Sequence, residues 1–407
     1  MKILFISSRL PYPAVKGDQV ILYNRLKHLS RKHEITLLTF YQDDRELKYL
    51  EKVKQYCENI ETVKMAPFES VINVLLLSAF SKLPLQSIYF KSNKFKQRLN
   101  RILDSADFDI VHTYMLRMAE YARHIDKPKV LDLIDSMQLN LEKRLALEKY
   151  PKKFLYAEEL KRMMLYEKNI VNEYEASIVV SESDRDYIAS DKVMAVPLGI
   201  DIDKYRRDSP LPDNKTIIFS GNMAYYPNES AIMWFLKKCF ESIRKSVPEV
   251  RLKIVGINPS NNIKRFHDGK TILVTGFVES IVNEIIASQV AIAPMHSGYG
   301  MHIKILEAMS CGLPVVSTSS GVGAIEAISG TDVIVADDPV SFSNHCVGLL
   351  QNYEKAQNIG IAARKLIVEK YSWNTHAEKL ENIYLTAIRQ FRTATQSSYD
   401  SGRDKLV

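Results

Sequence analysis

Residues 291–317 have the sequence AIAPMHSGYGMHIKILEAMSCGLPVVS, and this stretch decides the fold that we expect. A short apolar run ends at Pro294 and is followed by a glycine-containing loop, a helical pattern, another glycine and a second apolar run. Strand, loop, helix and strand in this order form a βαβ unit, which places two parallel strands in one sheet. The first turn of such a helix presents free backbone N–H groups, so the loop predicts an anion-binding site.

The same alternation continues outward from this stretch toward both ends of the chain. Several of the apolar runs are continuous, which is typical of parallel strands that are covered on both faces. Prolines and polar residues cluster at 196–213 and predict a linker between two doubly wound sheets. We expect strands at 2–7, 34–40, 109–113, 129–134 and 176–181 before the linker, and at 215–220, 251–256, 271–275, 290–294, 314–317 and 332–336 after it.

Composition excludes several other classes of protein. The 407 residues are 46% hydrophobic and 25% charged, as in ordinary globular proteins, and the net charge of +7 favours anionic partners only mildly. The four cysteines are scattered, so we expect neither a zinc site nor a disulfide framework. The N-terminal apolar run is too short for a signal peptide, and the longest apolar run, 71–80, is too short to span a bilayer. We therefore expect a cytoplasmic protein.

Lys304 and Glu307 are the candidate ligand-binding side chains of the decisive stretch. They share one helical face directly after a loop whose backbone amides could hold an anion, at Gly298, Tyr299, Gly300 and Met301. An ammonium group beside a helix N-terminus is suited to a diphosphate, and a carboxylate one turn later can accept hydrogen bonds from two ribose hydroxyls. A surface Glu–Lys pair without a ligand is the alternative interpretation.

The run LEAMSCGLPVV, from Leu306 to Val316, resembles the nucleotide-sugar signature of family 4 of the GT-B fold glycosyltransferases. The glycine-rich segment followed by Lys-x-x-Glu is similar to one branch of that family. Other segments resemble the family in the same order along the chain, at 196–201, 219–228, 274–278 and 371–373. The likeness covers nearly the whole chain and is strongest in 176–375.

This resemblance implies an α/β fold of the GT-B class, with two Rossmann-like doubly wound domains that face a cleft. The expected parts are an N-terminal acceptor domain at 1–198, a C-terminal nucleotide-sugar domain at 199–372, a helix at 373–395 that crosses back and packs on the N-terminal domain, and a frayed tail at 396–407.

The resemblance also implies roles for single residues. Glu307 matches the second Glu of the family's Glu-x7-Glu motif, which holds the ribose, whereas Tyr299 stands where the first Glu would contact the donor sugar. Lys304 takes the place of the Arg and Lys that often clamp the diphosphate. Three further donor-binding positions match family loops: Gly17, for which a tight turn without ligand is the alternative, Gly221 and Asn222.

Two residues that end N-terminal strands are candidate catalytic residues beside Lys304. His112 matches the histidine that faces the donor sugar in the family, and it ends an apolar strand where open α/β sheets place ligand-facing residues. A structural histidine with satisfied hydrogen bonds is its alternative. Asp135 could accept the proton of the acceptor or help to hold it, and a helix N-cap is its alternative.

We therefore expect a retaining, hexosyltransferase-type enzyme that moves a sugar from a nucleoside diphosphate sugar to a glycan or lipid-linked acceptor, in polysaccharide synthesis. Three scattered Asp-x-Asp triplets form no metal motif, so no metal ion, no further cofactor and no nucleic acid is expected. A nucleotide-sugar epimerase of the same fold and an inactive homologue that acts as a scaffold are the alternatives.

The segment 71–103 predicts a second kind of contact. An apolar run is followed by a helical pattern with Phe95, Leu99 and Ile102 on one face and several Lys and Arg residues elsewhere. This composition suits a peripheral contact with the anionic inner face of a membrane. An ordinary helix that faces the core and keeps its lysines in solvent is the alternative.

Overall fold

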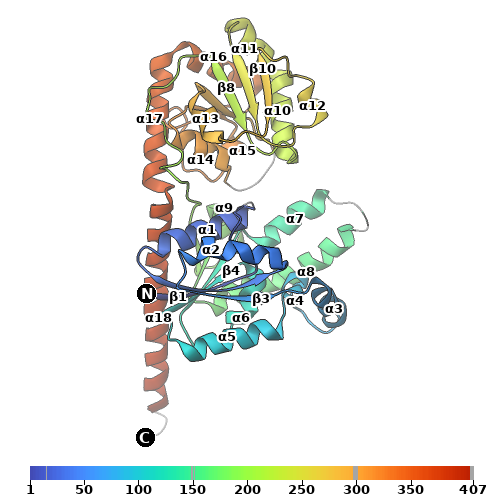
Figure 1. Cartoon of the computed structure of the whole chain (residues 1–407), viewed down its shortest axis with the longest axis vertical. Helices are drawn as coiled ribbons and strands as arrows, with labels where there is room; N and C mark the ends of the chain where they lie inside the picture. The colour runs from blue at the N-terminus through green and yellow to red at the C-terminus, as the bar shows by residue number, and fades with distance from the viewer. Residues whose placement is uncertain (15, 148–149, 151, 297–300, 404–407) are drawn as a thin grey trace. The chain divides into compact units, whose positions relative to one another are not determined.

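The computed structural model describes residues 1–14, 16–147, 150, 152–296 and 301–403. The chain divides into two compact units, each built on its own parallel sheet (Figure 1). Unit 1 comprises Met1–Pro197 and Ala377–Val407, and unit 2 comprises Leu198–His376.

The sheet of unit 1 has seven parallel strands in the order β3-β2-β1-β4-β5-β6-β7. Its central strands are continuous apolar runs because both of their faces are covered by helices, with α1 and α2 on one side and α5 and α6 on the other (Figure 1). The strands are β1 (Lys2–Ser7), β2 (Glu34–Tyr41), β3 (Asn59–Lys64), β4 (Ile110–Tyr114), β5 (Lys129–Ile134), β6 (Ala176–Val179) and β7 (Val193–Ala195).

Long and short helices connect these strands. They are α1 (Gly17–Leu29), α2 (Leu50–Lys54), α3 (Pro67–Leu77), α4 (Leu85–Tyr89), α5 (Asn93–Ser105), α6 (Ala119–Ala122), α7 (Met137–Leu147), α8 (Lys152–Ile170) and α9 (Glu182–Ile188). Helix α5 begins after Ser92, whose hydroxyl accepts a hydrogen bond from the Phe95 backbone N–H at 3.3 Å. The apolar stripe of α5 is buried in the core of unit 1, as predicted for an ordinary helix that faces the core.

The sheet of unit 2 has six parallel strands in the order β10-β9-β8-β11-β12-β13. The strands are β8 (Thr216–Ser220), β9 (Arg251–Val255), β10 (Ile272–Gly276), β11 (Val290–Ala293), β12 (Val315–Ser317) and β13 (Ile334–Val335). The helices are α10 (Tyr226–Lys238), α11 (Phe240–Ser246), α12 (Asn261–Lys264), α13 (Ile281–Ile286), α14 (Ile303–Ser310), α15 (Ser319–Val322), α16 (Pro339–Gln351) and α17 (Tyr353–Lys370). Both sheets confirm the expected pair of doubly wound domains.

Each expected strand is present, and two further strands, β3 and β7, were not expected. Both lie at the edges of their sheet. Edge strand β3 has a single buried residue, Val63, so it lacks the continuous apolar run by which the central strands are found.

The decisive stretch forms β11, α14 and β12, as predicted. Gly312 ends α14 with a φ of +67°, and the Leu313 backbone N–H donates to the Ala308 carbonyl at 3.0 Å. The carbonyl oxygen of Gly312 would lie only 2.2 Å from a Cβ at Gly360, so α17 can pack this closely on the end of α14 because residue 360 is glycine. Gly312 of the sequence signature therefore ends α14, and Gly360 allows the close packing behind it.

Helix α18 (Trp373–Arg403) begins in unit 2 and continues into unit 1. The Ser372 hydroxyl accepts a hydrogen bond from the Thr375 backbone N–H at 3.1 Å and caps the helix. In unit 1, Leu380 and Tyr384 on α18 are fully buried. The helix extends into the stretch expected to be a tail, because no proline or glycine interrupts the sequence there before Gly402. Within the described part of the chain, no helix has the length and apolar character needed to cross a membrane.

Candidate functional site

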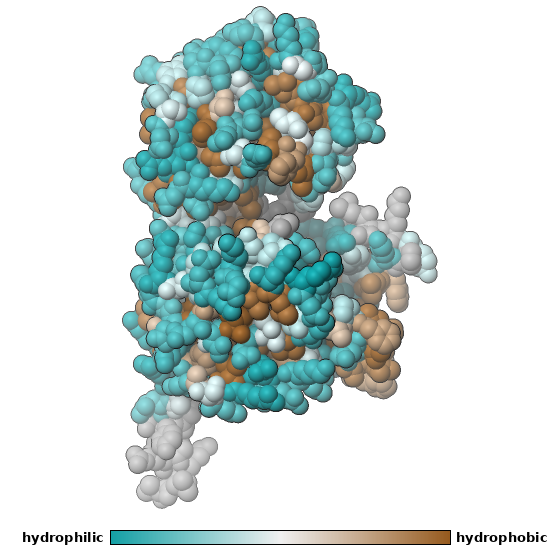
Figure 2. Space-filling view, viewed as in Figure 1, coloured by the Kyte–Doolittle hydropathy of each residue, from teal (hydrophilic) through white to brown (hydrophobic). Residues whose placement is uncertain are grey.

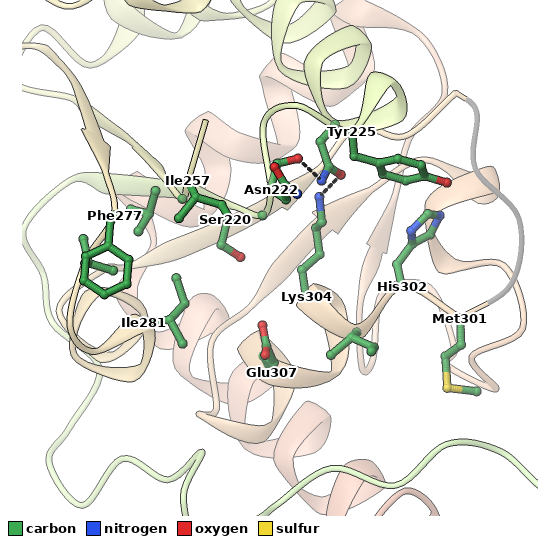
Figure 3. Close-up of a pocket in the computed structure, with 16 residues that line it drawn as sticks. Ser220, Asn222, Tyr225, Ile257, Phe277, Ile281, Met301, His302, Lys304 and Glu307 are labelled. Carbon is green, nitrogen blue, oxygen red and sulfur yellow. Dashed lines mark hydrogen bonds between the residues drawn. The ribbon is translucent and has the colours of Figure 1, made fainter. Parts of the chain in front are cut away.

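A hollow of about 610 Å³ lies in unit 2 at the carboxyl ends of β8, β9 and β10 and at the N-terminal end of α14 (Figure 3). Open α/β sheets bind ligands at this edge, because the loops there leave backbone and side chains free. The residues that line the hollow are Ser220, Gly221, Asn222, Tyr225, Asn228, Val255, Gly256, Ile257, Phe277, Val278, Ile281, Met301, His302, Ile303, Lys304 and Glu307.

Two glycines allow the loops after β8 and β9 to approach each other closely. A Cβ at Gly256, where φ is +146°, would lie 1.8 Å from the Gly221 carbonyl oxygen. A Cβ at Gly221, where φ is +149°, would lie 2.8 Å from Nδ2 of Asn228 and 3.3 Å from Nζ of Lys304. Gly221, a predicted donor-binding residue, therefore lies directly beside the predicted lysine.

Lys304 lies in the first turn of α14, and its ammonium group is held in a defined position (Figure 3). Its Nζ donates to Oδ1 of Asn228 at 2.6 Å and lies 4.2 Å from the centre of the Phe219 ring. Asn228 in turn donates through Nδ2 to the backbone carbonyl of Asn222 at 2.9 Å. Burial lowers the pKa of Lys304 to about 7, and the negative charge of Glu307 only partly opposes this effect.

Glu307 lies one turn later on α14. Its Oε1 accepts a hydrogen bond of 2.5 Å from the hydroxyl of Tyr205, which belongs to the segment before β8. Among the described residues, Oε2 of Glu307 has no hydrogen-bond partner. Burial raises the pKa of the carboxyl group, whereas Tyr205, Lys204 and Lys304 oppose this shift. The hydrogen bond to Oε1 therefore orients the carboxylate, and Oε2 is available to a ligand.

His302 precedes α14 and also lines the hollow. Its Nε2 is buried without a hydrogen-bond partner in the described part of the chain. Burial, with a smaller effect of the Lys304 charge, lowers the pKa of His302 to about 4, so the imidazole is neutral near pH 7. Met301 lines the same hollow, whereas the predicted residues Gly298, Tyr299 and Gly300 lie outside the described residues.

The other predicted residues lie in unit 1. Gly17 is the first residue of α1, and nothing lies within 4 Å of where its Cβ would be. It is close in sequence to a second hollow, of about 300 Å³, at the carboxyl ends of β1 and β2. That hollow is lined by Ser8, Arg9, Tyr12, Pro13, Lys16, Gln19, Phe40, Tyr41, Gln42, Glu46, Tyr49 and Phe90.

His112 is fully buried on β4. Its Nε2 lies 3.2 Å from Oδ2 of Asp132, and its Nδ1 lies 2.7 Å from the hydroxyl of Tyr384 on α18. Its ring stacks on Phe5 with the ring centres 4.4 Å apart, and Asp132 also forms an ion pair with the buried Arg25. These contacts are those of a structural histidine with satisfied hydrogen bonds. A catalytic role of His112 stays a prediction.

Asp135 follows β5 and is partly buried. The N-cap of α7 is the neighbouring residue, because the hydroxyl of Ser136 accepts a hydrogen bond from the Leu139 backbone N–H at 3.2 Å. Burial and the nearby charge of Asp184 raise the pKa of Asp135 to about 6. The N-cap alternative for Asp135 is therefore wrong, and its predicted role as a proton acceptor stays untested.

Comparisons with known proteins concern the fold of the chain and the family of unit 2. Residues 214–352 match the family described as Glycosyl transferases group 1. An uncharacterized 44.6 kDa protein in the cps region of Klebsiella pneumoniae is 26% identical over 393 residues, which cover 91% of this chain and 96% of that protein.

Solved structures share the fold over nearly the whole chain. Anabaena Alr3699/HepE in complex with UDP has a TM-score of 0.65 at 16% identity and covers 94% of this chain and 99% of its own. Sucrose-phosphate synthase from Thermosynechococcus elongatus has a TM-score of 0.66 at 14% identity and covers 97% of this chain and 100% of its own. The match over residues 214–352 supports a glycosyltransferase, and the two parallel sheets have the GT-B fold of these solved structures.

Proposed function

We propose that this protein is a retaining family 4 glycosyltransferase, which transfers a hexosyl group from a nucleoside diphosphate sugar to a glycan or lipid-linked acceptor. The observation that carries the proposal is the pair formed by Lys304 and Glu307, which share one face of α14 and line one hollow. A partly buried ammonium group and an oriented carboxylate, one helical turn apart, are matched to the diphosphate and the ribose of one ligand.

The hollow offers a different chemistry to each part of such a donor. Lys304 and the first backbone N–H groups of α14 would bind the diphosphate. Oε2 of Glu307 would accept hydrogen bonds from the ribose hydroxyls. Ile257 and Phe277, which are 42% and 75% exposed and line the hollow, would cover the base with apolar surface.

In the reaction, the bond between the anomeric carbon and the diphosphate breaks while the acceptor hydroxyl oxygen forms a new bond to that carbon. Negative charge grows on the leaving diphosphate, and the ammonium group of Lys304 stabilises it without any metal ion. The acceptor hydroxyl loses its proton, and Asp135, whose pKa of about 6 lies close to neutrality, is our candidate to receive it.

We propose that the hollow of unit 1 holds the acceptor. It combines the aromatic rings of Tyr12, Tyr41 and Tyr49 with polar side chains such as Arg9 and Glu46. Rings that cover the apolar face of a sugar, with polar groups for its hydroxyls, are suited to a glycan. The relative in the Klebsiella pneumoniae cps region supports a role in polysaccharide synthesis.

Isothermal titration with UDP and with GDP tests the donor site directly, and UDP is the first probe because the Anabaena neighbour is solved with UDP and with UDP-glucose. We expect one of the two nucleotides to bind to the unchanged protein and to lose at least about tenfold in affinity in Lys304→Ala. Lys365→Ala is the matched control, since Lys365 is an exposed lysine of unit 2 on α17. Equal affinities in all three proteins would overturn the proposal.

A donor screen that measures nucleoside diphosphate release separates transfer from the alternatives. We expect release to require an acceptor and to continue in the presence of EDTA. A sugar epimerised in the absence of acceptor would contradict transfer and support an epimerase.

A further inference from the structure

Helix α3 turns almost all of its apolar side chains toward solvent. Of its residues Pro67–Leu77, only Ser70 is buried. Phe68, Leu75 and Leu76 are 77%, 72% and 64% exposed, and Phe80, just after the helix, is 92% exposed. Figure 2 shows apolar side chains gathered where Figure 1 places α3. An exposed apolar face of this kind marks an interaction surface.

Two side chains of α8 fix the orientation of this helix. Arg162 donates from Nη2 to the Ser78 carbonyl at 2.9 Å and from Nη1 to the Ser81 carbonyl at 2.7 Å. Glu159, also on α8, accepts a hydrogen bond of 2.5 Å from the Leu85 backbone N–H. Because these contacts hold the chain directly after α3, the apolar face of the helix is held outward.

The apolar surface continues along α8. Leu155 and Leu165 are 56% and 69% exposed, and their spacing from Arg162 places all three on one side of the helix. Arg162 contacts the end of α3, so Leu155 and Leu165 lie on the side of α8 that faces this helix end. We name this surface, formed by the exposed apolar residues of α3, Phe80, Leu155 and Leu165, the apolar platform.

Positive charge lies on the chain directly after α3. From Ser70 to Leu103 the chain contains six Lys and Arg residues and no Asp or Glu, although Glu69 in the first turn of α3 is exposed. Lys82 follows Phe80 closely, and the backbone carbonyl of Lys91 accepts a hydrogen bond of 3.0 Å from Nδ2 of Asn73 on α3. Lys91 and Lys94 are exposed. Apolar side chains beside a surplus of cations match a bilayer that carries anionic headgroups, since the two contributions add.

We propose that the apolar platform inserts into the surface of an anionic phospholipid bilayer and attaches unit 1 to it. The contact is made by α3 and the adjoining side of α8, not by the apolar stripe of α5, which is buried. The proposal is independent of the donor site, because every residue that it uses lies in unit 1.

Flotation of the full chain with vesicles tests this proposal. We expect the protein to float with vesicles of phosphatidylcholine and phosphatidylglycerol in equal parts, to bind phosphatidylcholine alone far more weakly, and to be released partly by added salt. Phe68→Glu/Leu75→Glu should weaken binding by about tenfold or more, because it places two charges in the inserted face. Lys82→Ala/Lys91→Ala should weaken binding to the anionic vesicles only.

Val340→Glu/Ile361→Glu is the matched control, because these residues of unit 2 are also exposed apolar side chains, at 70% and 59%. We expect it to float as the unchanged protein does. Unaltered flotation of Phe68→Glu/Leu75→Glu would overturn the proposal, as would a dimer that this variant dissociates while no variant binds vesicles. Thermal unfolding of the same samples, which should give the same midpoint for all variants, shows that they are folded and keeps this test separate from that of the donor site.

Discussion

Both units hold charged side chains at or beside their parallel sheets, but these are fully buried in unit 1 and partly buried in unit 2. In unit 1, Arg25, Asp132, His112 and Tyr384 contact one another and are fully buried. In unit 2, Lys304 donates to Asn228 and more weakly to the sulfur of Met295, Glu307 accepts from Tyr205, and both face a hollow. The difference teaches that burial of charge alone does not mark a site: in unit 1 the charges are matched by the protein, whereas in unit 2 they are matched only in part.

The largest effect should follow from removing the charges that face the hollow. We expect Lys304→Ala and Glu307→Ala each to lower the rate of sugar transfer by about 10²–10³-fold, because each removes a group that stabilises or positions the donor. The melting temperature of unit 2 should change little. Steady-state assays of nucleoside diphosphate release, with thermal unfolding of the same samples, measure both quantities.

Lys365→Ala serves again as the control in this assay, since its exposed partner Glu369 is 4.0 Å away. Its rate should equal that of the unchanged protein. If Lys304→Ala were equally active, the two units would not differ in the way described above, and Lys304 would be a structural residue.

Unit 1 should show the opposite pattern, with a large effect on stability. Arg25→Met leaves Asp132 buried without its cationic partner, and we expect it to lower the free energy of unfolding by about 3–5 kcal/mol. Urea unfolding followed by circular dichroism measures this loss. A loss below about 1 kcal/mol would contradict the view that the charges of unit 1 stabilise one another.

Lys304→Met is the matching variant in unit 2. Unlike Arg25→Met, it should not lower the free energy of unfolding. The pKa of Lys304 falls from an ordinary 10.5 to about 7 on folding, so between these values the unfolded chain holds more protons and stability rises with pH. Below pH 7, Lys304 is protonated in the folded protein, and its full destabilising effect on the free energy of unfolding is present. Removing it should therefore leave unit 2 as stable as before or more stable.

The same pKa predicts how donor affinity depends on pH. Anion binding requires the protonated Lys304, so affinity for a nucleoside diphosphate sugar should fall between pH 7 and pH 9, by at most about tenfold per pH unit. The pKa of His302, about 4, lies below this window, and burial beside Glu307 raises that of Tyr205 above it. Isothermal titration with UDP-glucose, whose diphosphate does not titrate in this range, measures the effect.

Lys304→Arg distinguishes this cause from any other titration. An arginine stays protonated throughout the window, so the affinity of this variant should be nearly independent of pH even if it is weaker. A fall in affinity as steep as that of the unchanged protein would show that another group titrates.

The sequence was sufficient where the interaction is local. Lys304 and Glu307 are three residues apart, so helical periodicity alone placed them on one face, and the continuous apolar runs located the central strands. Their partners could not be found in this way, because Asn228 and Tyr205 are 76 and 102 residues distant from them. His302 could have been found, since it is a titratable residue directly before the helix.

Tertiary structure decides two further features. The apolar run at 71–80 is exposed on α3, as a peripheral contact requires, but no periodicity in the run itself distinguishes this outcome from burial in a core. The position of His112 at the end of a strand is typical of a ligand-facing residue. Its surroundings are instead set by Arg25 and Tyr384, which lie on helices far away in the sequence.

The smallest predicted effect examines His112 itself. Tyr384→Phe removes only the hydroxyl that is 2.7 Å from Nδ1 of His112, and we expect it to lower the stability of unit 1 by about 0.5–1.5 kcal/mol. If His112 is a structural residue, the rate of sugar transfer should stay the same, because the ring remains fixed by Phe5 and Asp132. A loss of rate without a loss of stability would instead assign His112 a part in the reaction, and the contrast between the two units would then be one of degree.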